Sequence, residues 1–88
     1  MTIKECVKKY GWNISCELPR IVRRADVDVD FINTEGSEDE TQFTLSEYGT
    51  NAATEELNTL FADFCKDEHI KANTVTSVTI VGAYEEAV

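Results

Sequence analysis

The fold is decided by residues 24–31, which read Arg24-Ala25-Asp26-Val27-Asp28-Val29-Asp30-Phe31. Apolar and charged side chains alternate strictly here, and a period of two is typical of a strand with one buried and one solvated face. We expect the apolar members to face a core and the aspartates to face the opposite way. Because the strand is long and lies between a basic segment and a hairpin, we expect it inside the sheet.

A hairpin follows this strand. Residues 33–37 read Asn-Thr-Glu-Gly-Ser, which is turn chemistry. The acidic run 38–40 begins the return strand, which continues over 41–48 with Phe43 and Leu45 inward. We therefore expect the two strands to pair antiparallel around a solvated loop.

Helical periodicity flanks the hairpin. Residues 2–11 open with Thr2 and Glu5, the T-x-x-E pattern of a capping box. Residues 51–69 carry an apolar stripe at helical spacing, formed by Leu57, Leu60, Phe61 and Phe64. We expect a helix in each segment, and the longer one is predicted to pack on the sheet.

Two further segments predict strands. Residues 12–18 alternate in apolar character, and residues 74–84 are rich in β-branched side chains. The alternation of the last strand is imperfect, because Val78 and Ile80 share one parity while Val75 and Val81 share the other. A β-bulge or burial on both faces explains such a pattern equally well.

The predicted order is therefore α-β-β-β-α-β over one domain, residues 1–88. We predict an α+β fold, with a mostly antiparallel sheet of three to four strands and one or two helices packed on it.

Charge is strongly segregated along the chain. No Lys or Arg lies between Arg24 and Lys66, whereas eleven residues of that interval are Asp or Glu. Residues 1–24 hold six bases against two acids, a net charge of +4, and residues 25–88 hold two bases against fifteen acids, a net charge of −13, which together give −9. An acidic chain is repelled by nucleic acids and anionic membranes. We expect a basic protein partner, such as a nucleic-acid-binding enzyme, and no direct contact with nucleic acid or membrane.

The aspartates of the first hairpin strand are the candidate binding residues. Alternate residues of a strand lie about 6.6–6.8 Å apart, near the spacing of successive backbone phosphates. The acids on the neighbouring loop and strand are expected to extend this row. The predicted partner-binding residues are Asp26, Asp28, Asp30, Glu38, Asp39 and Glu40. The alternative is that these acids only keep the protein soluble and block edge-to-edge aggregation.

Metal and catalytic chemistry have weaker support. Residues 26–30 resemble the start of a calcium loop, but Phe31 and Ser37 stand where that loop needs a glycine and a bidentate glutamate. Cys65 and His69 have a spacing that can bind zinc, yet no Cys-x-x-Cys pair accompanies them. The sequence contains no nucleophile elbow, no phosphate-binding glycine loop and no recognisable Cys–His setting. We predict a non-enzymatic protein with no catalytic residues, no metal and no cofactor.

The cysteines and the N-terminal residues bear on location. Cys6, Cys16 and Cys65 make an odd, sparse set that favours free thiols in a reducing compartment. The first residues also lack the apolar segment of a secretory signal. We expect a cytoplasmic protein.

The N-terminal bases admit two roles. Lys8, Lys9, Arg20, Arg23 and Arg24 can form salt links to the acidic strand within the chain, or they can contact a second copy. The second role makes a homodimer possible.

In composition and rough architecture, as a small, acidic α+β domain without a catalytic motif, this chain resembles the inhibitors that phages and mobile elements encode against restriction or CRISPR systems. The resemblance implies an inhibitor or nucleic-acid mimic that docks on the basic surface of a nucleic-acid-binding enzyme. The alternative, from a different class, is a small structural or regulatory homodimer whose acidity serves solubility only.

Overall fold

The computed structural model describes residues 1–85 and confirms the predicted element order and the α+β class. The elements are α1 (Ile3–Tyr10), β1 (Asn13–Ile14), β2 (Arg24–Ile32), β3 (Glu38–Leu45), α2 (Asn51–Glu68) and β4 (Val75–Tyr84). Within this part of the chain, neither helix combines the length and apolarity that a membrane span requires.

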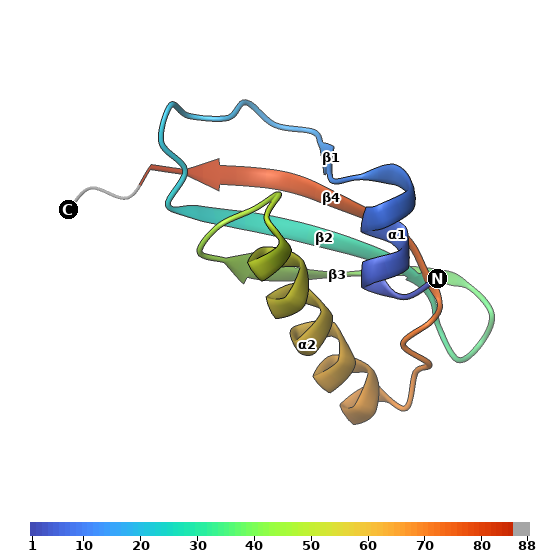
Figure 1. Cartoon of the computed structure of the whole chain (residues 1–88). Helices are drawn as coiled ribbons and strands as arrows, with labels where there is room; N and C mark the ends of the chain where they lie inside the picture. The colour runs from blue at the N-terminus through green and yellow to red at the C-terminus, as the bar shows by residue number, and fades with distance from the viewer. Residues whose placement is uncertain (86–88) are drawn as a thin grey trace.

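The four strands form one sheet in the order β1-β4-β2-β3. β2 runs antiparallel to both of its neighbours, β3 and β4, while β1 pairs parallel to β4. The predictions of a mostly antiparallel sheet and of an interior position for β2 are therefore confirmed. Both helices lie on the same side of the sheet (Figure 1), so in the described part of the chain no helix covers its other face.

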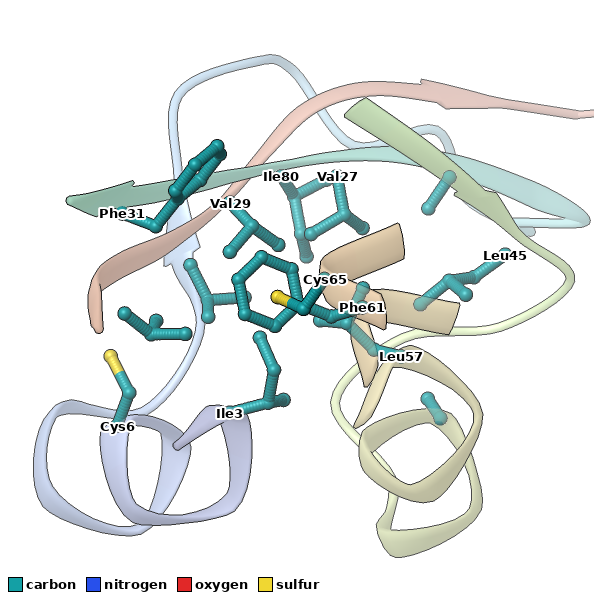
Figure 2. Close-up of a cluster of buried hydrophobic side chains, with 14 residues drawn as sticks. Ile3, Cys6, Val27, Val29, Phe31, Leu45, Leu57, Phe61, Cys65 and Ile80 are labelled. Carbon is teal, nitrogen blue, oxygen red and sulfur yellow. The ribbon is translucent and has the colours of Figure 1, made fainter. Parts of the chain in front are cut away.

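The hydrophobic core lies between the sheet and the two helices (Figure 2). β2 contributes Ala25, Val27, Val29 and Phe31, all at most 1% exposed. The remaining core residues are Ile3 and Cys6 of α1, Ala53, Leu57, Phe61 and Cys65 of α2, Leu45 of β3, and Val75, Val78 and Ile80 of β4. The phenylalanine rings of residues 31, 43, 61 and 64 pack mostly edge to face, with centroids 5.7–6.5 Å apart.

The helix ends follow from their capping residues. Thr2 and Glu5 form the predicted capping box of α1. The Thr50 hydroxyl accepts from the Ala53 N–H at 3.0 Å at the start of α2. This helix ends at His69, whose left-handed backbone (φ 57°, ψ 39°) stops the helical path.

The imperfect alternation of the last strand comes from β-bulges. Opposite β2, the register passes from Phe31↔Val75 to Asp30↔Ser77 and later from Val27↔Ile80 to Asp26↔Gly82. Thr76 and Val81 are therefore extra residues in β4. Each one shifts the alternation by one residue, so that apolar side chains on both sides of it point to the core. The bulge, rather than burial on both faces, is the correct alternative, because Val81 is 36% exposed.

Two strand boundaries differ from the predictions. The strand expected over 12–18 is reduced to Asn13–Ile14, with Ile14 and Leu18 exposed. Pairing with β4 ends beside Ile80, just before the bulge at Val81 bends the partner strand away. The return strand, expected to reach residue 48, stops at Leu45 because its partner Ala25 lies next to the first residue of β2.

Candidate functional site

The buried side chains of β2 fix the positions of its aspartates. Because successive strand residues point to opposite faces, Asp26, Asp28 and Asp30 lie on the sheet face that no helix covers. All three are half-buried by their neighbours on the sheet rather than fully exposed. Their spacing is thus set by a rigid strand whose other face is anchored in the core.

The register of the hairpin adds a second row of acids. Asp30 lies opposite Glu40, and Ile32 lies opposite Glu38, so both glutamates share the face of the aspartates. We call Asp26, Asp28, Asp30, Glu38 and Glu40 the acidic sheet face. Five of the six acids predicted from the sequence are thus brought together on one surface.

Asp39 has a different position from the other five. It lies opposite the buried Phe31, so the alternation directs it away from the acidic sheet face. It is exposed near the start of β3, where its Oδ1 accepts from the Glu40 N–H at 2.8 Å. Asp39 therefore belongs to the end of the hairpin and not to the row on the sheet.

A shallow depression of about 590 Å³ lies where the end of β2, the start of β3 and the start of β4 meet. Its lining residues are Asp30, Glu38, Asp39, Glu40, Thr76 and Ser77. The carboxylates of Asp30, Glu38 and Glu40 beside the hydroxyls of Thr76 and Ser77 offer only oxygen acceptors and weak donors. This combination suits an ammonium or guanidinium group. We call this feature the acidic depression.

Hydroxyl groups hold two of the three aspartates in place. The Thr44 Oγ1 donates to Asp26 Oδ1 at 2.9 Å, and the Tyr84 hydroxyl also donates to the Asp26 carboxylate. The Ser77 Oγ donates to Asp30 Oδ2. The hydrogen bond to Asp26 and the negative charge of that carboxylate raise the pKa of Tyr84. Ionisation of Tyr84 would remove the donated proton and place two anions side by side.

Asp28 lies in the middle of the row, between Gln42 on β3 and Thr79 on β4. Partial burial raises the pKa of Asp28, and the charges of Asp30 and Asp26 raise it further. Like charges held side by side on a strand oppose folding. The repulsion within the acidic sheet face is therefore concentrated at this residue.

The N-terminal bases do not neutralise the acidic sheet face. The ion pair found over residues 1–85 joins Lys4 Nζ to Glu55 Oε1 at 2.8 Å, on the surfaces of the two helices. The Arg24 guanidinium, at the start of β2, lies over the Tyr84 ring at 5.1 Å from its centroid. Over residues 1–85 none of the five bases forms an ion pair with the acidic strand, so the expectation of internal salt links is wrong. Arg24 stacks on an aromatic ring instead.

Arg24 nevertheless makes the surface asymmetric. It shares the face of the aspartates and lies two residues before Asp26, so it offsets the charge at that end. The acidic depression lies at the other end, beside Asp30. The carboxylates of Asp30, Glu38 and Glu40 therefore lie at the end of the face that Arg24 does not offset.

The cysteines and His69 form no metal site in the described part of the chain, where no group of three or more His, Cys, Asp or Glu residues is placed to hold an ion. Cys6 and Cys65 belong to the core, and burial raises the pKa of both thiols. They act there as small hydrophobic residues.

Sequence reasoning missed the hydroxyl groups that surround the carboxylates. Thr44, Ser77 and Tyr84 are placed there by the pairing of β2 with β3 and β4. The sequence alternation of β3 could have predicted Thr44, because every second residue from Glu38 and Glu40 points to the same face of the sheet. The two bulges of β4 hide the equivalent signal for Ser77 and Tyr84, since each bulge changes the parity.

Comparison of the chain with protein-family models, with curated proteins and with solved structures finds no match.

Proposed function

We propose that the protein is a non-enzymatic inhibitor that docks its acidic sheet face on the basic, nucleic-acid-binding surface of a partner protein. The observation that carries the proposal is the gathering of five carboxylates on a sheet face that no helix covers. Acids that served solubility alone would have no reason to collect where they repel one another. Electrostatic complementarity of this kind speeds association and selects partners.

The geometry supports mimicry of a nucleic-acid backbone. The carboxylates of β2 follow one another at about 6.7 Å, and the row on β3 runs about 4.8 Å beside them. Arg and Lys side chains that contact phosphates in a nucleic-acid-binding groove would meet carboxylates at a similar spacing. The acidic depression is the place where one such cationic side chain would be held from several sides.

The proposed targets are nucleic-acid-binding enzymes of restriction or CRISPR systems, which would make the protein an anti-defence factor acting in the cytoplasm. The support is the resemblance in composition and rough architecture, together with the anionic surface. The competing proposal is a structural or regulatory homodimer whose acids only confer solubility, and the experiment below separates the two.

The test compares two variants of equal charge. The face variant carries Asp30→Lys, Glu38→Lys and Glu40→Lys. The helix variant carries Glu56→Lys, Asp63→Lys and Glu68→Lys, three exposed positions on α2. Three reversals raise the net charge from −9 by six units in each variant. The two proteins therefore differ in where the acids are lost and not in how many are lost.

Each immobilised protein is used to capture binding proteins from a bacterial lysate at low salt. Wild type and the helix variant are expected to retain the same basic, nucleic-acid-binding proteins, and the face variant is expected to lose them. Added duplex DNA should displace the captured proteins, because it competes for the same basic surface. Equal capture by the two variants, or capture that DNA leaves unchanged, would contradict the proposal.

A further inference from the structure

The outer edge of β3 is a free strand edge. β3 is the last strand in the order β1-β4-β2-β3, and within residues 1–85 its eight residues, Glu38–Leu45, pair only with β2. A strand of this length at a sheet edge presents a row of unpaired N–H and C=O groups to another chain. The opposite edge differs, because β1 covers β4 there with only two residues.

The hydrogen bonds at the hairpin show which residues point to the free edge. The Asn33 N–H donates to the Ser37 carbonyl at 2.9 Å, and the Ile32 N–H donates to the Thr74 carbonyl at 3.1 Å. The backbone N–H and C=O groups of successive β2 residues therefore hydrogen-bond alternately to β3 and to β4. By the observed register, four residues of β3 direct their backbone N–H and C=O groups away from β2, toward the free edge: Glu38, Glu40, Gln42 and Thr44. The Glu40 N–H agrees with this, since it donates to the side chain of Asp39 and not to β2.

Charge is distributed unevenly along this edge. The first three residues of β3 are Glu38, Asp39 and Glu40, whereas Thr41–Leu45 carries no charge. If two copies of β3 pair antiparallel about a two-fold axis, the acidic half of each strand lies beside the neutral half of the other. Cross-strand contact between like charges, which destabilises a sheet, is thereby avoided.

The position of the axis follows from the same repulsion. An axis at Glu40 places the two Glu40 side chains directly opposite each other, and an axis at Thr41 leaves them about 8 Å apart. An axis at Gln42 separates them by about 14 Å, beyond the Debye length at physiological salt. In that register Gln42 lies opposite its own equivalent and Glu40 lies opposite Thr44. Residues 39–45 are all paired, and Thr41 of the second copy covers the half-buried Phe43.

We propose that the protein forms a homodimer through antiparallel pairing of β3 with β3 of a second copy, centred on Gln42. The Glu40 N–H then donates to the Thr44 carbonyl of the second copy in place of Asp39 Oδ1. The result is a continuous eight-stranded sheet. Because the axis is perpendicular to the sheet, both acidic sheet faces point the same way and both helical layers lie on the other side.

The dimer and the proposed docking on a basic partner have opposite salt dependence. Each copy carries a net charge of −9, so screening by salt favours association of two copies. Docking of the acidic sheet face on a basic surface is weakened by salt. The dimer is also independent of that function, so either proposal can fail without the other.

Two lysine variants test the interface. Gln42→Lys places like charges opposite each other at the axis, whereas Thr79→Lys adds the same charge on the same face in an interior strand. Both positions lie opposite Asp28, so each lysine meets the same carboxylate within one copy. Thermal unfolding is measured first to confirm that both fold. The dimer dissociation constant is then measured by analytical ultracentrifugation at about 0.1 M and about 1 M salt.

We expect wild type to dimerise more tightly at the higher salt. Gln42→Lys should raise the dissociation constant about fivefold or more, and Thr79→Lys should change it by less than about twofold. Mixing Gln42→Lys with Gln42→Glu should give a heterodimer tighter than either homodimer, because residue 42 meets only its own equivalent. A wild-type monomer at high salt and submillimolar concentration, equal effects of the two lysines, or a tighter dimer with Gln42→Lys would overturn the proposal.

Discussion

Replacement of Asp28 by asparagine is expected to stabilise the protein. Asp28 has one aspartate on each side along β2, each about 6.7 Å away. Two unit charges at that distance repel by about 0.6 kcal/mol at the dielectric constant of water, so two neighbours contribute about 1.2 kcal/mol. Screening at physiological salt reduces this by roughly half. Asp28→Asn should therefore raise the free energy of unfolding by about 0.5–1 kcal/mol at pH 7, or the Tm by about 2–8 °C.

The pH dependence of this gain has a definite sign. The folded state raises the pKa of Asp28 above the value of about 3.9 that an unfolded chain shows. Ionisation of Asp28 therefore opposes folding, and the penalty is fully present above the raised pKa. It falls as the pH drops through that pKa and disappears below the unfolded value. The advantage of Asp28→Asn should be largest at neutral pH and should shrink toward pH 4.

Thermal and urea denaturation of wild type and Asp28→Asn at pH 7 and at about pH 4 measure this directly. Asp63→Asn is the control, because it removes one exposed acid from α2. The positive charge of Lys66 and the negative charge of Asp67, one turn further along that helix, offset each other. The reasoning is refuted if Asp28→Asn fails to stabilise at pH 7. An equal gain in about 1 M salt, where the Debye length is about 3 Å, would also refute it.

Three further predictions concern the hydroxyl network, the core and a helix cap. Asp26→Asn should lower the pKa of Tyr84 toward that of an ordinary tyrosine, which ultraviolet titration detects, and an unchanged titration would contradict the contact. Phe61→Ala should lower the free energy of unfolding by about 3–5 kcal/mol and Phe64→Ala by less, because Phe61 is 1% exposed and Phe64 only half-buried; urea denaturation would expose a reversed order. Thr50→Ala should cost about 1 kcal/mol through loss of its hydrogen bond to the Ala53 N–H, and urea denaturation showing no loss of stability would exclude that capping role.

Much of the fold could be predicted because local signals agree with the tertiary structure. The strict alternation of β2 predicts both its buried face and its acidic face, since one face must pack on the helices. The capping box of Thr2 and Glu5 and the apolar stripe of α2 locate the helices for the same reason. These elements carry their periodicity within themselves.

The features that escaped prediction depend on pairing between distant segments. The shortness of β1 results from a bulge in β4, more than sixty residues away. The place of Asp39 outside the acidic sheet face depends on the register of the hairpin. The stacking of Arg24 on Tyr84 requires the two strands to be adjacent, which no local pattern reveals.

The association rate constant with a purified, captured partner is the measurement that tests the proposed docking most directly. Wild type, the face variant and the helix variant are compared at several salt concentrations. The account predicts that the face variant associates at least about tenfold more slowly and loses most of the salt dependence, while the helix variant stays close to wild type. Equal slowing of both variants would mean that net charge alone governs the encounter, and the acidic sheet face would then have no special role.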